Sequence, residues 1–291
     1  MEYFRIDFDA SGKILKEAQR ESFFQFIQRE RPGRVLFVAH GWLNDVYASG
    51  RLFAWFAEAL RPVPVCGIAW PSHPFRRNTA GLVEAGVEAT SYYLMKERAA
   101  DVGTGGLAPL VRTLKSVSGA TEAHFAGHSF GARLVTAAAM ALGRPEGQAM
   151  VESMMLIQAA FSQFAFSPGG FFRPVVEERM VRWSIGVTHT VHDKAVGLAY
   201  PFASFLRKQN ASGLGGPNDP YGGLGANGAR GLGPEECVHV NIDDVATIEK
   251  YRGTPVINLN ADRVIPGHTQ FCKPQVAAAL RALMGVAVKA G

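Results

Sequence analysis

The chain has few cysteines and no long apolar run, and both absences narrow the kinds of protein it can be. Its three cysteines are scattered through 291 residues and are odd in number: Cys66, Cys237 and Cys272. They favour small buried side chains in a reducing compartment over a disulfide framework or a metal cluster. No stretch approaches the roughly 18 consecutive apolar residues of a membrane span, and residues 1–7 have no apolar signal region. The sequence thus predicts a cytoplasmic protein without stable membrane insertion.

Charge is spread along the chain and forms no block of one sign. The formal net charge is +5 and the pI is near 9.2, but the basic residues form no run longer than pairs such as Arg76-Arg77. No recognised nucleic-acid-binding motif accompanies them, so we interpret them as solvated surface and expect no nucleic-acid partner. A hydrophobic content of 47% is typical of a globular protein, and nothing in the sequence specifies an oligomeric state.

Residues 123–139 have the order of a strand, a sharp turn and a helix. At the centre is the pattern G-x-S-x-G, formed by Gly127, Ser129 and Gly131. A serine on such a strained turn leaves no room for side chains two residues before and after it, which explains the two glycines. The Ser129 hydroxyl would stand clear of the sheet, and the backbone N–H of Phe130 would point at a negative charge developing beside it. An ordinary strand-to-helix turn is the alternative.

A second candidate donor lies upstream. Residues 34–39 form a continuous apolar run, which is typical of a strand buried on both faces of a parallel sheet, and His40, Gly41 and Trp42 follow it. Because parallel strands end at one edge of their sheet, the Trp42 N–H would emerge beside Ser129, and Gly41 would let the backbone approach a substrate closely. We interpret His40 as a packed, hydrogen-bonded side chain that shapes this loop, with direct catalysis as the alternative.

Segments of strand and helix character alternate along the chain. Strands are expected at residues 2–8, 34–39, 65–70, 123–126, 150–160, 181–191, 238–242 and 256–260. Helices are expected at residues 15–29, 80–95, 107–114, 130–139 and 195–206. A further helix is expected between a cap at Asn44 or Asp45 and Pro62, with its apolar stripe at residues 52–60. The alternation predicts an α/β fold with a mostly parallel central sheet flanked by helices, in a single domain over residues 1–291.

Residues 212–233 are rich in glycine, with nine in 22 positions. They include residues 223–228, which formally match the dinucleotide-binding pattern G-x-G-x-x-G. No strand is expected before this match and no helix after it, so a long surface loop is favoured over phosphate binding. The pattern therefore gives no reason to expect a nucleotide cofactor.

The sequence resembles the α/β-hydrolase superfamily of serine esterases, lipases and related acyl hydrolases. The resemblance covers most of the chain. It rests on Gly-His-Ser-Phe-Gly at residues 127–131, on His-Gly-Trp at 40–42, and on an aspartate and then a histidine further along, in the family's order. It implies an α/β-hydrolase fold with a small cap region, and hydrolysis of a small-molecule acyl substrate without a cofactor.

The cap is expected at residues 161–180, where this fold often has an excursion that covers the site. The segment begins with five clustered phenylalanines around a Pro-Gly-Gly sequence. We expect an apolar inner face on which Phe171 and Phe172 line a pocket for the acyl chain; a small separate core, unrelated to substrate, is the alternative. Tyr92, on the helix expected at 80–95, is a further pocket candidate, with an ordinary position on the helix surface as the alternative.

A serine nucleophile needs a histidine to take its proton. Among the eight histidines, His268 follows the final strand in a Pro-Gly loop and is the candidate base, whereas His239 lies inside a strand pattern. His189 and His192 lie just before Asp193 and would suit a metal, but no further ligand cluster with familiar spacing accompanies them, so no metal site is expected.

The histidine in turn needs a carboxylate to hold it in the right tautomer. Asp193, after the strand at 181–191, is chosen because the family places its acid one strand before the histidine. Asp262, six residues before His268, is the alternative acid; the competing interpretation of Asp262 is a turn former that binds loop N–H groups.

The sequence therefore predicts a serine hydrolase that cleaves a carboxylic ester or related acyl bond. Ser129, His268 and Asp193 would form the catalytic triad, and the reaction would pass through an acyl-enzyme intermediate. The alternative from another class is a catalytically silent protein that uses the same pocket to bind a ligand or another protein.

Overall fold

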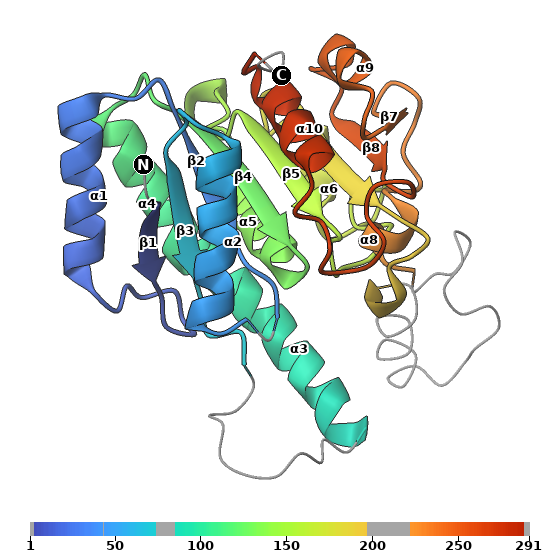
Figure 1. The fold of residues 1–291 in the computed structure, drawn as a ribbon, viewed down its shortest axis with the longest axis horizontal. Helices are drawn as coiled ribbons and strands as arrows, with labels where there is room; N and C mark the ends of the chain where they lie inside the picture. The colour runs from blue at the N-terminus through green and yellow to red at the C-terminus, as the bar shows by residue number, and fades with distance from the viewer. Residues whose placement is uncertain (1–2, 43, 74–84, 197–221, 288–291) are drawn as a thin grey trace.

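An eight-stranded sheet, parallel throughout, runs through the centre of the protein (Figure 1). The structure is a computed structural model that describes residues 3–42, 44–73, 85–196 and 222–287, with the backbone alone for 85–93. In spatial order the strands are β1 (Phe4–Asp7), β3 (Val65–Ala69), β2 (Arg34–Ala39), β4 (Glu122–His128), β5 (Ser153–Ile157), β6 (Ile185–His189), β8 (Val256–Asn260) and β7 (Cys237–Asn241). Because the strands are parallel, their carboxyl ends share one edge, which is the lower edge in Figure 1.

Helices cover both faces of this sheet (Figure 1). One face carries α1 (Glu17–Glu30), α3 (Ala85–Val102), α4 (Ala108–Val117), α5 (Phe130–Leu142), α6 (Arg173–Glu177) and α8 (Leu224–Asn227). The other face carries α2 (Val46–Ala59), α9 (Val245–Lys250) and α10 (Pro274–Met284). Each helical layer closes one apolar cluster against the sheet, and the two clusters form the core.

Strand β2 shows why the apolar runs of the sequence become strands. Val35 and Phe37 belong to the cluster on one face of the sheet, and Leu36 and Val38 belong to the cluster on the other face. Alternate side chains of a strand point to opposite faces, so a strand covered by helices on both sides needs apolar residues at every position. The continuous apolar run follows directly from burial on both faces.

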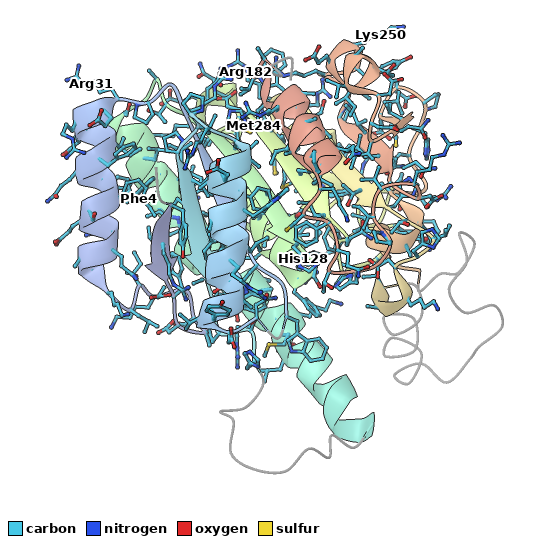
Figure 2. All side chains as sticks on the ribbon, viewed as in Figure 1. Phe4, Arg31, His128, Arg182, Lys250 and Met284 are labelled. Carbon is cyan, nitrogen blue, oxygen red and sulfur yellow. The ribbon has the colours of Figure 1, made fainter. Side chains whose placement is uncertain are left out.

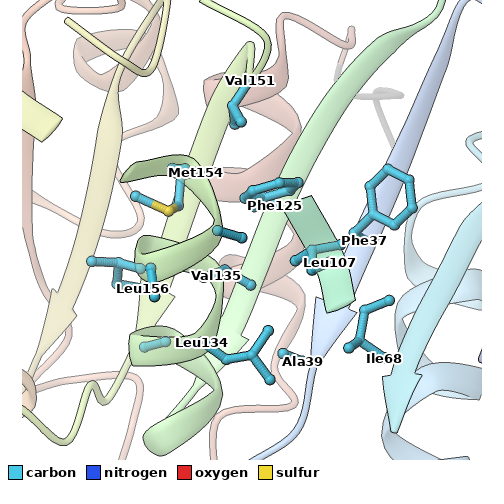
Figure 3. Close-up of a cluster of buried hydrophobic side chains, with 14 of the residues drawn as sticks. Phe37, Ala39, Ile68, Leu107, Phe125, Leu134, Val135, Val151, Met154 and Leu156 are labelled. Atoms are coloured by element: carbon cyan, nitrogen blue, oxygen red, sulfur yellow. The ribbon is translucent and has the colours of Figure 1, made fainter. Parts of the chain in front are cut away.

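Helix α5, which follows the G-x-S-x-G turn, lies against the middle of the sheet. Its residues 130–139 are all buried, and all of them except Arg133 and Thr136 are apolar or glycine. Figure 3 shows Leu134 of this helix beside Ala39 of β2, and Val135 among side chains of β4 and β5. The helix is therefore fixed on the sheet over most of its length, and its N-terminus holds the serine turn in place.

The α/β architecture predicted from the sequence, with a parallel central sheet flanked by helices, is confirmed. The expected strands at 150–160 and 181–191 are shorter, because Val151 and Val181 pair only in an isolated bridge before the ladder of β5 and β6 begins. Helices α9 and α10 were not among the predicted elements. The helix expected at 195–206 lies almost entirely outside the described residues.

The structure describes residues 222–233 of the surface loop expected at 212–233, and the expectation is wrong for residues 222–229. Residues 222–229 are buried and include the short helix α8. The Gly225 N–H donates to the Ala159 carbonyl oxygen over 3.0 Å, so the segment is bonded to the chain that follows β5. Glycine and alanine allow this close approach, which the composition of the segment alone does not distinguish from a flexible loop.

The phenylalanine-rich segment after β5 joins the main core, so the alternative of a separate core is wrong. Phe161, Phe166 and Phe172 are between 0 and 2% exposed, and their ring centroids lie 5.4 to 6.4 Å apart. They belong to the same apolar cluster as α5. Phe171 differs from them, because 63% of its surface is exposed.

Candidate active site

The turn between β4 and α5 places Ser129 at the carboxyl edge of the sheet. Ser129 has a backbone φ of 57° and ψ of −120°, a conformation that is rare for a residue with a side chain. A Cβ on Gly127 would lie 2.4 Å from the Gly131 carbonyl oxygen, and a Cβ on Gly131 would lie 2.3 Å from the Ala39 carbonyl oxygen. Both positions of the pattern therefore require glycine for steric reasons.

Ser129, His268 and Asp193 lie together in one chain of hydrogen bonds. The Ser129 Oγ is 3.0 Å from Nε2 of His268, and Nδ1 of His268 is 2.9 Å from Oδ2 of Asp193. The carboxylate can only accept, so Nδ1 carries the proton that it donates to Asp193, and Nε2 is left to accept from the serine hydroxyl. This is the tautomer that a base acting on Ser129 needs.

The order of the strands brings these three residues together. Ser129 follows β4, Asp193 follows β6 and His268 follows β8, and β6 and β8 are neighbours in the sheet. The Asp193 carboxylate is 1% exposed, and its Oδ1 accepts a hydrogen bond of 2.9 Å from the Val196 N–H. Asp262 lies elsewhere, with its Oδ1 accepting from the Val191 N–H over 2.9 Å.

His128, inside the pattern, supports the loop that carries His268. Its Nε2 donates to the His268 carbonyl oxygen over 3.0 Å, and its ring lies against the Phe271 ring with centroids 4.4 Å apart. Burial lowers the pKa of His128 well below its ordinary value of 6.5, and the neighbouring His268 ring acts in the same direction. His128 is thus a neutral residue that fixes the position of His268, a role that the sequence analysis did not assign to it.

The loop after β2 lies against the serine turn. A Cβ on Gly41 would lie 2.9 Å from the Ser129 Cβ, so only glycine fits at this point. The Trp42 ring contacts the Phe130 ring edge to face, with centroids 6.0 Å apart. The two peptides proposed as donors to a negative charge therefore come from loops that contact each other.

His40 is a packed, hydrogen-bonded residue, as expected from the sequence. It is 1% exposed, and its Nδ1 donates to the Gly41 carbonyl oxygen over 2.9 Å. Its Nε2 accepts from the Trp70 N–H over 3.2 Å, and the two rings stack. One neutral tautomer satisfies both bonds, and burial lowers the pKa of His40 from 6.5 to about 4.

This lowered pKa predicts a loss of stability in acid. Between pH 6.5 and about 4 the unfolded chain binds a proton at residue 40 that the folded protein does not, so stability falls as the pH falls. About two and a half pKa units correspond to about 3 kcal/mol. Urea denaturation should show a shallower pH dependence of the unfolding free energy for His40→Gln, whereas His192→Gln, at an exposed position, should follow the wild type. Equal slopes for all three proteins would contradict the prediction.

A cavity of about 560 Å³ lies beside the phenylalanine-rich segment. Phe161, Phe171 and Phe172 contribute to its wall, together with Arg133 of α5. The Arg133 guanidinium carbon lies 5.3 Å from the ring centroids of both Phe171 and Phe172. Tyr92 belongs to α3, but its side chain lies outside the described part of the structure.

Two further properties concern the described residues only. No three histidine, cysteine, aspartate or glutamate side chains among them are grouped in a way that would hold a metal ion. No helix among them has the length and apolarity needed to cross a membrane.

Gln158 is a polar residue near the site that the sequence analysis missed. It follows β5, between the ends of β4 and β6, and its Nε2 donates to Oδ2 of Asp193 over 2.9 Å. It is fully buried. A glutamine at the end of an otherwise apolar strand was the available signal, because polar side chains at the carboxyl edge of a parallel sheet gather near its ligand site.

Comparison with known proteins adds little. No protein-family model matches the chain, and no curated protein matches it in sequence. A solved structure of Trichoderma reesei cutinase with a phosphonate inhibitor is similar over 55% of this chain and 73% of the cutinase, with 13% identity and a TM-score of 0.30. Phospholipase PlaB from Legionella pneumophila, in complex with thio-NAD, is similar over 54% of this chain and 38% of the phospholipase, with 10% identity and a TM-score of 0.29. Similarity this low carries no argument about function, which has to come from the site.

Proposed function

We propose that the protein is a serine hydrolase that cleaves a carboxylic ester or related acyl bond. Ser129 would be the nucleophile, His268 the general base and Asp193 the carboxylate that holds the base. The observation that carries the proposal is the unbroken chain of hydrogen bonds from Ser129 through His268 to Asp193, with the serine on a strained turn between β4 and α5. Few structural roles would require a serine in this conformation at the end of such a chain.

The proposed reaction has two halves. In the first, the Ser129 Oγ bonds to the acyl carbon while its proton passes to Nε2 of His268, and the carbonyl oxygen takes the negative charge. The bond to the leaving oxygen then breaks, and His268 returns the proton to that oxygen. In the second half a water molecule attacks the acyl-enzyme in the same way and releases the acid. These steps need no metal or cofactor.

The Trp42 and Phe130 N–H groups are proposed to stabilise the negative charge. The carbonyl oxygen of Gly41 accepts from Nδ1 of His40 over 2.9 Å and from Nδ2 of Asn44 over 3.1 Å. In a trans peptide the C=O and the following N–H point in opposite directions. The two bonds on the Gly41 carbonyl therefore hold the Trp42 N–H on the other side of the peptide. Phe130 contributes its N–H from the first residue of α5.

The cavity beside residues 161–172 is proposed as the acyl pocket, with Phe171 and Phe172 in its wall. Phe171 lies two residues before the start of α6. Its ring contacts Arg133, which is one helical turn along α5 from Ser129. Tyr92 is retained as a pocket candidate on its backbone position in α3 alone. The phenylalanine rings of this wall offer apolar contacts to an acyl chain, and the wall also contains the charged residues Lys96, Glu97 and Arg133.

Replacing Phe171 by serine should weaken binding of long acyl chains in particular. Each methylene removed from water contributes roughly 0.8 kcal/mol, so a pocket that loses one phenyl wall should raise KM several-fold for an eight-carbon ester and little for a two-carbon ester. Phe171 is the suitable position because it is 63% exposed, whereas Phe172 is fully buried and its loss would disturb the core. Tyr47→Ser, at a side chain that is 73% exposed, is the matched control. Equal changes in KM for both esters would exclude Phe171 from the pocket.

Labelling with a fluorophosphonate probe tests the proposed function directly. The probe reacts with a serine that a neighbouring base activates and requires no knowledge of the substrate. Ser129 should be labelled, and His268→Ala should remove the labelling, because the hydroxyl then has no proton acceptor. A folded wild-type protein that stays unlabelled would point to the catalytically silent alternative.

A further inference from the structure

Gln158 has an unusual setting for a residue that follows a buried strand. It has a backbone φ of 46° and is fully buried. A residue with a side chain adopts this left-handed conformation rarely, and it persists where surrounding contacts hold it. Here the conformation turns the side chain amide toward Asp193 and away from the strand direction. The contacts of the amide therefore indicate the role of the left-handed conformation at Gln158.

All polar groups of the Gln158 amide are bonded. Nε2 donates to Oδ2 of Asp193 over 2.9 Å and to the Gly225 carbonyl oxygen over 3.2 Å. Oε1 accepts from the Thr188 hydroxyl over 2.9 Å. The same Thr188 oxygen accepts from the Gln158 backbone N–H over 3.0 Å, which leaves its own hydrogen for Oε1. Thr188 thus determines which end of the amide faces Asp193.

The glycine-rich segment completes this arrangement. A Cβ on Gly225 would lie 2.5 Å from the Gln158 carbonyl carbon, so residue 225 must be glycine for its carbonyl to reach the amide. The Gly225 carbonyl oxygen also accepts from the Thr190 N–H over 3.0 Å. One part of the glycine pattern is therefore explained by close packing against Gln158, with no role for a phosphate.

We propose that Gln158 is a positioning residue that holds the Asp193 carboxylate in the orientation that His268 requires. This inference rests on the proposed function. Oδ2 of Asp193 accepts from both Gln158 and His268, each over 2.9 Å, while Oδ1 accepts from the Val196 N–H. The three donors fix the plane of this carboxylate, which is 1% exposed, and stabilise its charge. Gln158 thereby acts on His268 and Ser129 through Asp193.

Gln158→Met tests this role because methionine keeps the length of the side chain but has no amide. A hydrogen bond to a charged group contributes roughly 1.5 to 3 kcal/mol, so kcat should fall about 10- to 100-fold. KM for a small ester should change less than about twofold, because Gln158 does not line the proposed acyl pocket. An unchanged kcat in the folded variant would overturn the proposal.

Asn258→Leu is the matched control. Asn258 is also a fully buried amide bonded to the glycine-rich segment, with its Oδ1 accepting from the Ala229 N–H and its Nδ2 donating to the Ala229 carbonyl oxygen. Its amide bonds to Ala229 and to the Cys237 sulfur, and not to Asp193. Each variant is assayed at the same number of degrees below its own Tm. If Gln158 is a positioning residue, only Gln158→Met should then lower kcat. Equal losses in both would show that Gln158 is merely structural.

A double-mutant comparison separates this proposal from the proposed function. In an Asp193→Asn background, Gln158→Met should lower kcat by less than about twofold, because the group through which it acts is already changed. A full 10- to 100-fold effect in that background would contradict the proposal. Fluorophosphonate labelling separates the two possible failures. A wild-type protein whose Ser129 stays unlabelled would contradict the proposed function. A labelled enzyme whose kcat is unchanged by Gln158→Met would contradict only the positioning role.

Gln158→Glu serves if the methionine variant does not fold. The introduced carboxyl has the same shape as the amide, donates to Asp193 only while it is protonated, and repels the Asp193 carboxylate once it is ionised. The ratio of variant kcat to wild-type kcat should therefore rise as the pH is lowered from about 8.5 to 6. A ratio that is constant over this range, in folded protein, would show that the donor at this position is irrelevant to the base.

Discussion

Replacing Ser129 by alanine is expected to lower kcat by ~10⁴-fold or more while leaving the protein folded. The reason is that the hydroxyl is the nucleophile in the proposed reaction and the group whose proton Nε2 of His268 accepts. Alanine retains the Cβ, so it can make the same contact with Gly41 and adopt the same strained backbone conformation. Hydrolysis of a short aryl ester, measured with circular dichroism on the same samples, gives the result.

Ser116→Ala is the control for this substitution. Ser116 is exposed on α4, and its hydroxyl donates to the Thr113 carbonyl oxygen over 2.8 Å. Its loss should leave kcat within about twofold of the wild type. Wild-type turnover in a folded Ser129→Ala protein would exclude the proposed mechanism, and the hydrogen-bonded chain would then need a structural explanation.

The second large effect is expected at the acid. Asp193→Asn should lower kcat by ~10³- to 10⁴-fold, because an amide group can turn its NH₂ toward Nδ1 of His268 and select the wrong tautomer, and it cannot stabilise the imidazolium. The effect should be large here because Oδ2 of Asp193 is bonded directly to that nitrogen over 2.9 Å. The shape of the pocket should not change, since asparagine and aspartate have the same size.

Asp262→Asn is the matched substitution, one strand away. The Oδ1 of Asp262 accepts from the Val191 N–H, and asparagine retains an oxygen that can accept this bond. We expect a loss of no more than about threefold in kcat at comparable stability. A larger loss for Asp262→Asn than for Asp193→Asn, with both variants folded, would transfer the role of acid to Asp262.

Much of the architecture was accessible from the sequence because burial imposes local patterns. Strands covered on both faces need apolar residues at every position, so residues 34–39 predict β2 with the bounds that the structure has. The strained turn leaves no room for a side chain at residues 127 and 131, so the pattern around Ser129 is also set by short-range sterics. In both cases the requirement lies within a few residues of sequence.

Other features were not accessible because they depend on contacts between distant segments. The burial of residues 222–229 arises from bonds to the chain after β5, and a glycine-rich composition fits a buried segment as well as a surface loop. The inclusion of Phe172 in the main core depends on its contacts with Phe161 and Phe166, which sequence periodicity does not reveal. The expectation of a surface loop and the alternative of a separate core therefore failed for the same physical reason.

The sequence by itself determined the class of fold, the serine turn and a short list of partners for it, with Asp193 and Asp262 both possible as the acid. The tertiary structure decided which carboxylate faces His268, because β6 and β8 are neighbours in the sheet and Asp262 turns toward the Val191 N–H. It alone revealed that Gln158 meets Asp193, since the two residues lie 35 positions apart and come together only when β5 pairs with β6. Local steric requirements involve residues that are neighbours in the sequence, whereas the direction of a buried polar side chain depends on partners that the folded sheet brings to it.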